Sequence, residues 1–326
     1  MRHGLTDQDP LWVPLLPHYQ PDGRIDGRRM TSHLNSVAQH VRQIMVAGST
    51  GDGWELDDER YAEVVEWALG AAPKEVKVIF GALRPDTESV ISRIKMIEQR
   101  IAHEAPFRRR YVGVTVCPPV KEDASQDEIV AHYRAILMET ESDVALYQLP
   151  QVTGCTLSAE TVEALSSEPS IIMFKDSSGT DEVTSDARDL SQLLKVRGAE
   201  GGYVEAVITQ RYDGWLLSTA NAFGGELRQI EELIRSDRND EARQLSGRLS
   251  DAVGQLFEAA AQEAGANAFS NANRAADHIA AFGRHWRDVP LPLKQDGTRL
   301  SRGLAERAFE LMESLYCVRE EGYLRA

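Results

Sequence analysis

Short apolar runs alternate along this chain with longer stretches in which apolar residues recur every three or four positions. The short runs are typical of buried parallel strands, and the longer stretches are typical of amphipathic helices. We therefore expect strands at residues 11–16, 43–47, 76–80, 111–117, 144–149, 171–174, 195–198 and 215–218. The intervening helices are expected at residues 25–41, 57–69, 87–103, 125–140, from 158, 183–194, from 203 and 226–236.

Eight strand–helix repeats predict an α/β fold class, a (β/α)8 TIM barrel with a C-terminal helical extension. The alternative is an open doubly wound sheet, which would carry a GxGxxG motif after its first strand, and that motif is absent. Residues 1–237 are the predicted barrel, which carries the active site. Residues 238–326 form the predicted helical domain, with helices expected at 240–264, 268–282 and 301–317.

Composition and charge narrow the range of functions. The formal net charge of −15 opposes binding to a nucleic acid, which requires a basic surface. The three cysteines are far apart and form no CxxC pair, which favours a reducing compartment and predicts a cytoplasmic protein. No secretion signal is visible, and no apolar run approaches the roughly 18 residues of a membrane span, so we expect no membrane partner.

Lys175 follows the apolar run at 171–174 and precedes the turn Asp176-Ser177-Ser178-Gly179. Active sites of parallel barrels lie at the C-terminal ends of the strands, which is where this lysine is expected. Loss of water disfavours an ammonium, and a neutral amine can attack a ketone to form a Schiff base. The alternative is a lysine that ends the strand and reaches into solvent, and we interpret Asp176 as a turn residue.

Two further segments end at the same predicted barrel mouth. Gly48, Ser49 and Thr50 form a compact loop whose N–H groups and hydroxyls suit a carboxylate or a phosphate. Tyr147 lies near the end of the fifth predicted strand, where it can relay protons to Lys175. The alternatives are an ordinary turn and a core tyrosine. A serine hydrolase that uses Ser49 would need a histidine and aspartate partner, and the sequence identifies none.

Other motifs for cofactors are absent. The loop at residues 48–51 is not followed by the Gly-Lys-Ser/Thr of a P-loop, and Ala47 replaces the first glycine of a GxSxG nucleophile elbow. The eight histidines show no HExxH or comparable spacing. We therefore predict no metal and no cofactor.

The motifs together resemble the dihydrodipicolinate synthase / N-acetylneuraminate lyase family of class I aldolases. The resemblance covers about residues 11–320. It rests on four segments, which are Pro-Leu-Leu-Pro with Asp22–Asp26, Gly48-Ser49-Thr50-Gly51-Asp52, Tyr147-Gln148-Leu149-Pro150 and Lys175-Asp176-Ser177-Ser178-Gly179. It implies a barrel with a helical appendix and a homo-oligomer, either a dimer or a tetramer.

The resemblance also implies roles for the site residues. Lys175 is the expected Schiff-base lysine, Tyr147 the proton-handling tyrosine, and Ser49 a catalytic and binding residue. Ser49 and Thr50, in the loop that begins at Gly48, are expected to hold the carboxylate of a 2-oxo acid such as pyruvate. The implied activity is that of a carbon–carbon or carbon–oxygen lyase, since an iminium withdraws electrons from the adjacent carbon.

Four positions depart from the family pattern. Cys117-Pro118-Pro119-Val120 lacks the tyrosine of the synthases, and Val152 replaces an arginine that binds the second substrate. Asp52 replaces a glutamate and Gln148 an asparagine. We therefore expect an enzyme other than the lysine-pathway synthase. The alternative is a catalytically impaired family member that binds a 2-oxo acid.

Overall fold

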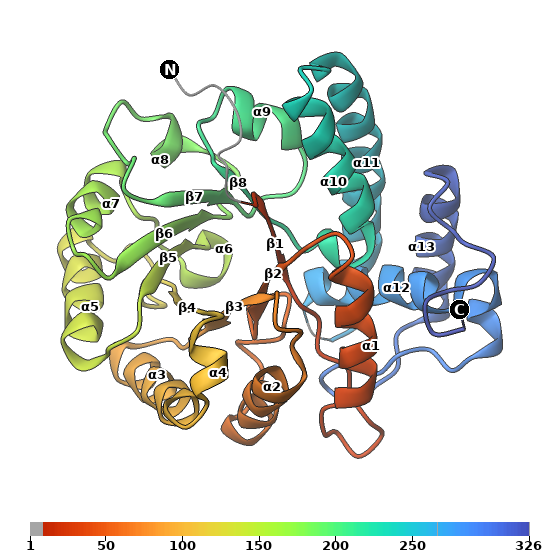
Figure 1. Cartoon of the computed structure of the whole chain (residues 1–326), viewed down its shortest axis with the longest axis horizontal. Helices are drawn as coiled ribbons and strands as arrows, with labels where there is room; N and C mark the ends of the chain where they lie inside the picture. The colour runs from red at the N-terminus through yellow and green to blue at the C-terminus, as the bar shows by residue number, and fades with distance from the viewer. Residues whose placement is uncertain (1–8, 266, 326) are drawn as a thin grey trace.

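The computed structural model describes residues 9–265 and 267–325, and it contains a closed barrel of eight parallel strands followed by C-terminal helices (Figure 1). The strands pair in chain order, and β8 closes the barrel against β1. They are β1 (Leu11–Pro14), β2 (Gln43–Val46), β3 (Lys77–Gly81), β4 (Tyr111–Val116), β5 (Val144–Gln148), β6 (Ile171–Asp176), β7 (Leu194–Arg197) and β8 (Gly214–Leu216). The predicted α/β barrel is confirmed.

Helices surround the strands on the outside, except for the short α6, which is seen within the ring of strands (Figure 1). Those of the barrel are α1 (Gly27–Val37), α2 (Asp58–Ala71), α3 (Thr87–Ala102), α4 (Ala105–Arg108), α5 (Gln126–Glu139), α6 (Pro150–Thr153), α7 (Ala159–Ser166), α8 (Glu182–Ser185), α9 (Tyr203–Ile208) and α10 (Ala220–Arg235). The remaining helices are α11 (Asn239–Ala260), α12 (Ala268–Phe282), the 3-10 helix η1 (Gly283–Asp288) and α13 (Arg302–Ser314).

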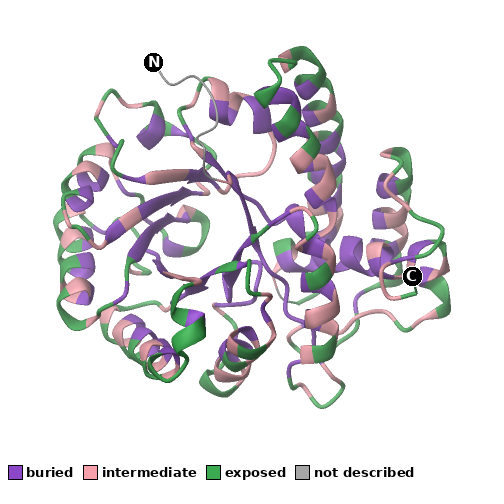
Figure 2. Cartoon of the chain, in the orientation of Figure 1, coloured by how far each residue is buried: buried purple, intermediate pink, exposed green. Residues whose placement is uncertain are grey.

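The hydrophobic pattern predicted most of these elements because each strand is buried and each helix has one apolar face. Figure 2 shows buried strands and helices that are buried on the side facing the barrel. The helix starts follow from capping residues, since Asp57, Asp86, Ser125 and Ser158 each accept a hydrogen bond from a backbone N–H in the first turn. Hydrogen bonds between residues close in sequence therefore set the starts of these helices.

The helix predicted at residues 183–194 is wrong. Only Glu182–Ser185 is helical, and Leu194 already belongs to β7. The Asp186 carboxylate accepts from the backbone N–H of Arg188, and the Asp189 carboxylate accepts from that of Ser191. These local turns compete with helical hydrogen bonds, so the segment follows an irregular path.

Two boundaries near the barrel mouth also differ from the prediction. Strand β6 continues through Asp176, so Lys175 lies within the strand rather than after it. Helix α10 starts at Ala220 and continues past a non-helical Phe223, whereas the pattern predicted a start near residue 226. The sequence did not indicate this first turn, because Gly224 and Gly225 follow it directly and glycine is unfavourable within helices.

The C-terminal helices pack beside the barrel, with α11 against α9 and α10, and α12 against α10 and α13 (Figure 1). The Arg29 guanidinium on α1 forms an ion pair with the Asp277 carboxylate on α12. The proposed domain boundary at residue 237 lies between α10 and α11. None of the helices in residues 9–265 and 267–325 combines the length and the apolar character that a bilayer span requires.

Candidate active site

Lys175 lies inside the mouth of the barrel. It pairs in register with Tyr147 of β5 and Val196 of β7, so the three side chains leave the sheet on the same face. The lysine side chain is buried, and its Nζ is 3.8 Å from the centroid of the Tyr147 ring. The alternative of a lysine extended into solvent is therefore wrong.

The surroundings of the Lys175 amine contain little compensating charge. Within the described part of the chain, no carboxylate forms an ion pair with it. The neighbouring Cys117 thiol is buried, and this burial raises its pKa despite the opposing effect of Lys175. The Cys117 thiol is therefore uncharged and does not act as a counter-ion for Lys175.

Asp176 points to the opposite face of β6 because successive side chains of a strand alternate. Its fully buried carboxylate accepts hydrogen bonds from the Ser178 backbone N–H at 2.8 Å, Gln148 Nε2 at 3.2 Å and the Tyr212 hydroxyl at 3.1 Å. These contacts are those of a residue that supports the turn after Lys175, in agreement with the sequence interpretation.

The loop after β2 brings Ser49 to the tyrosine. Ser49 Oγ lies 3.3 Å from the Tyr147 hydroxyl and accepts a hydrogen bond of 3.1 Å from Trp54 Nε1. Gly48 permits close packing in this loop, since a Cβ there would lie 2.7 Å from Met45 Sδ. A chain of contacts therefore runs from Ser49 through Tyr147 to Lys175.

The N-terminal end of helix α12 forms hydrogen bonds with the loop after β2. Asn267 Nδ2, at its N-terminus, donates to the Ser49 carbonyl at 2.6 Å, and Ser270 Oγ donates to the Thr50 carbonyl at 2.9 Å. Sequence reasoning missed both supporting residues. They lie more than two hundred positions from the loop, and isolated polar residues on a helix have no recognisable spacing.

Lys175, Tyr147, Ser49 and Thr50 line one cavity of about 210 Å³ at the C-terminal ends of the strands. Gly48 belongs to the same loop but does not line the cavity. The other lining residues are Pro14, Leu149, Gln151, Ser177, Ser178, Gly179, Gly198, Ala199, Glu200, Leu216, Ser218, Phe257 and Phe269. The four predicted residues that line the cavity therefore share one small chamber.

Glu200 is a cavity residue that the sequence analysis missed. It follows β7 in a loop without a recognisable motif. Its carboxylate accepts hydrogen bonds from Ser218 Oγ at 2.6 Å, Thr219 Oγ1 at 2.6 Å and the Tyr203 hydroxyl at 3.2 Å. These donors hold the carboxylate at the cavity wall and occupy both of its oxygens.

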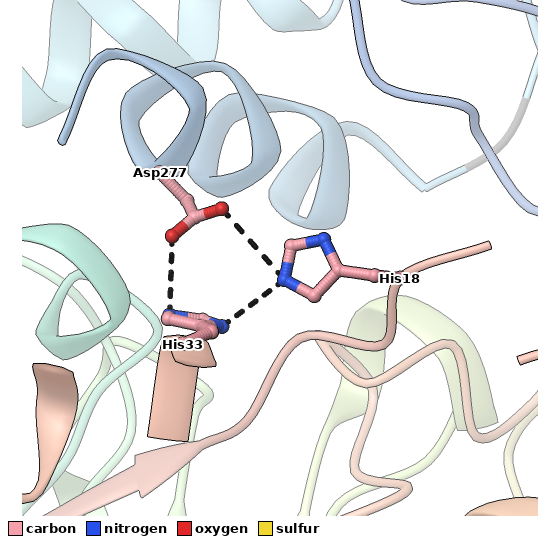
Figure 3. A group of neighbouring side chains, drawn as sticks. All are labelled: His18, His33 and Asp277. Atoms are coloured by element: carbon pink, nitrogen blue, oxygen red, sulfur yellow. Dashed lines mark hydrogen bonds and ion pairs between the residues drawn. The ribbon is translucent and has the colours of Figure 1, made fainter. Parts of the chain in front are cut away.

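Away from the Lys175 cavity, a cluster of residues of the types that bind metals lies at the junction of α1 and α12 (Figure 3). His18, His33 and Asp277 are buried there, and their ligand atoms lie within 4.8 Å of one another. His18 Nε2 is 3.2 Å from His33 Nδ1, and His33 Nε2 is 3.0 Å from the Asn221 carbonyl oxygen. The residues are distant in sequence, so histidine spacing did not indicate them.

The charges around this cluster favour a structural network over a cation site. Burial lowers the pKa of both His18 and His33, so neutral imidazoles can donate from Nε2 to the partners described. The Asp277 carboxylate already faces the Arg29 guanidinium and accepts from the Tyr323 hydroxyl. A bound cation would compete with Arg29 for the same carboxylate.

Known proteins share this architecture. Among curated sequences, the 4-hydroxy-tetrahydrodipicolinate synthase of Xanthomonas campestris pv. campestris is 27% identical over 238 residues, covering 72% of this chain and 75% of that protein. YagE from E. coli K12, a prophage protein solved in complex with pyruvate, superimposes with a TM-score of 0.80 at 16% identity, covering 96% of this chain and 100% of that one.

CdNal from Clostridium difficile, solved in complex with mannosamine, superimposes with a TM-score of 0.78 at 18% identity, covering 95% of this chain and 100% of that chain. These two structural likenesses support the fold. Residues 9–273 match the model of the Dihydrodipicolinate synthetase family, and this range includes the barrel, α11 and the first part of α12. The chain therefore belongs to the dihydrodipicolinate synthetase family, and its general activity is that of a class I aldolase-type lyase.

Proposed function

We propose that this protein is a lyase that acts on a 2-oxo acid through a Schiff base at Lys175. The observation that carries the proposal is the buried Lys175 amine in the same cavity as Tyr147, Ser49 and Thr50, without a carboxylate partner among the described residues. The deprotonated amine adds to the C2 carbonyl of pyruvate, water leaves, and an iminium forms. Loss of a C3 proton then gives an enamine.

The enamine carries out the bond-forming step. Its C3 carbon adds to the carbonyl carbon of a second reactant, whose oxygen takes up a proton, and water hydrolyses the iminium to release the product. Cleavage is the reverse sequence. Tyr147 lies between Ser49 and Lys175, where its hydroxyl can carry protons to and from these intermediates. Ser49 and Thr50 bind the carboxylate and orient the ketone toward the amine.

The proposed reaction differs from that of the lysine-pathway synthases. Val120 and Val152 stand where the family pattern has a substrate-site tyrosine and an arginine, and both valines are exposed. Neither can bind a second carboxylate, which requires a hydrogen-bond donor or a cation. We further propose a cytoplasmic homo-oligomer, in keeping with the family resemblance.

Reduction of the imine tests the proposal. Incubation with pyruvate and borohydride should convert the Lys175 imine to a stable secondary amine, which peptide mass mapping detects as a carboxyethyl group. Lys195 is an internal control, because its ammonium is paired with Asp213 at 2.8 Å and should stay unmodified. Lys175→Gln should abolish labelling, and Lys95→Gln, which removes an exposed ion-paired lysine, should not.

The outcomes separate catalysis from binding. Labelling at Lys175 that depends on pyruvate supports the proposed chemistry. A thermal shift with pyruvate but no labelling and no turnover would instead indicate the 2-oxo-acid binding protein that the sequence left as the alternative. Labelling spread over surface lysines at equal yield would contradict the proposal.

A further inference from the structure

Two aromatic side chains from the C-terminal helices line the outer part of the Lys175 cavity. Phe257 on α11 and Phe269 on α12 pack edge to face, with ring centroids 5.2 Å apart and an interplanar angle of 85°. Phe257 is half-buried, and Phe269 is 49% exposed. An exposed phenylalanine at the edge of a cavity is an unfilled apolar surface, and a third ring can pack against such a pair.

The charge of the cavity excludes an anionic second reactant. Among the described side chains that line the cavity, Lys175 is the only basic residue and Glu200 is the only acidic one. Lys175 becomes the iminium nitrogen during the reaction. Glu200 is an acid, so it repels a second carboxylate or a phosphate, and none of the described lining residues carries a guanidinium to bind one.

Two polar side chains on the cavity wall already donate to partners within the protein. Gln151 Nε2 donates to the Ser177 carbonyl at 3.2 Å, and Ser218 Oγ donates to Glu200. A polyhydroxylated chain that packs against the Phe257 and Phe269 rings would place hydroxyl groups on a surface without hydrogen-bond partners, which is unfavourable. An aromatic substituent meets no such penalty.

We propose that the second reactant, or the fragment released on cleavage, is an uncharged aromatic aldehyde that packs against Phe257 and Phe269. The proposal rests on the Lys175 Schiff-base chemistry above and assigns its substrate class. In the direction of synthesis, C3 of the enamine forms a bond to the aldehyde carbon, the aldehyde oxygen gains a proton, and hydrolysis regenerates Lys175. The product is a 4-aryl-4-hydroxy-2-oxobutanoate.

A competition of aldehydes tests this assignment. With pyruvate at saturation, benzaldehyde, glyceraldehyde and the anionic glyoxylate are compared as acceptors, and products are measured by mass spectrometry. We expect kcat/KM for benzaldehyde to exceed the other two by about tenfold or more. Equal or better turnover of glyceraldehyde or glyoxylate would overturn the assignment.

Variants of the aromatic pair test the mechanism of selection. Phe257→Ala should lower kcat/KM for benzaldehyde about tenfold and change that for glyceraldehyde less, while Phe257→Leu should retain part of the preference. Met138→Ala, which truncates an exposed apolar residue outside the cavity, should change neither. If Phe257→Ala does not fold, Phe269→Ala serves the same purpose, because Phe269 is the more exposed of the two rings. An equal effect on all aldehydes would contradict the proposal.

Borohydride trapping with pyruvate alone tests the Lys175 chemistry separately from the class of the second reactant. A Lys175 adduct without an aromatic preference would overturn only the substrate class. Absence of the adduct would overturn the proposed function and, with it, this assignment.

Discussion

Arg274 of α12 and Asp52 of the loop after β2 form an ion pair, with 2.9 Å between Nη2 and Oδ2, and both side chains are only 1% exposed. The Tyr19 hydroxyl also donates to Asp52, at 2.8 Å. Asp52 lies three positions after Ser49, so the pair connects the C-terminal helix to the loop that is proposed to bind the carboxylate. The helical extension therefore supports the active site directly.

Arg274→Met should both destabilise the protein and weaken pyruvate binding. Removing one partner of a buried ion pair leaves the other charge unpaired, at a cost of about 3–5 kcal/mol in the free energy of unfolding. Urea denaturation and the KM for pyruvate measure the two effects. Arg284→Met, which breaks exposed ion pairs with Glu313 and Glu320, is the control and should cost about 1 kcal/mol or less.

The double variant Arg274→Met/Asp52→Asn completes this experiment. If the two residues act as a pair, its loss of stability is smaller than the sum of the two single losses. Strict additivity would show that the connection between α12 and the loop does not depend on this contact.

Tyr147→Phe should reduce kcat while Lys175 remains reactive toward pyruvate. The variant keeps the ring beside the amine but removes the hydroxyl near Ser49, so proton transfer is lost, with an expected decrease of about 10²–10⁴-fold. Steady-state kinetics give kcat, and borohydride trapping reports the imine. Tyr111→Phe is the matched control, because its hydroxyl bonds Ser142 and it does not line the cavity. Unchanged kcat in Tyr147→Phe would remove the tyrosine from the mechanism.

Ser49→Ala should raise the KM for pyruvate. A hydrogen bond to a charged carboxylate contributes about 1.5–3 kcal/mol, which corresponds to roughly a tenfold or larger increase in KM if binding is at equilibrium. The same change also leaves Trp54 Nε1 without its acceptor, so a melting curve should accompany the kinetics. Ser191→Ala, in an exposed turn, is the control. An unaltered KM would indicate that Thr50 and the loop backbone bind the carboxylate without Ser49.

Acidification should destabilise the protein between pH 6.5 and pH 4. Burial lowers the pKa of His132 to about 4, and it lowers those of His18, His33 and His278 as well. In this range the unfolded chain binds protons at these histidines and the folded chain does not. The contribution of these histidines to the free energy of unfolding is therefore greatest above pH 6.5 and falls as the pH decreases.

Urea denaturation at a series of pH values checks this expectation. His132→Gln should reduce the slope, because His132 contributes up to about 3 kcal/mol over the interval from pH 6.5 to its folded pKa. Glutamine can replace the contacts of the imidazole with Thr87 Oγ1 and the Cys117 carbonyl. A wild-type stability that is constant over this interval would contradict the shifts in pKa.

The strand and helix order followed from the sequence because burial and helix capping depend on residues a few positions apart. Lys175, Tyr147, Ser49 and Thr50 could be predicted for a related reason. Each lies close to the C-terminal end of a strand, either within its last two residues or in the loop that follows it, and in a parallel barrel all these ends meet at the same mouth. Their assigned catalytic and binding roles stay predictions.

The sequence by itself determined the barrel, its helical extension and the four residues that share the cavity. Only the tertiary structure decided which residues of the C-terminal helices contact the cavity and the loop after β2. Phe257 and Phe269 enter the cavity, and Arg274 reaches Asp52, from helices that carry no motif. These contacts depend on how α11 and α12 pack against the barrel, and packing between distant segments leaves no periodic pattern in either one.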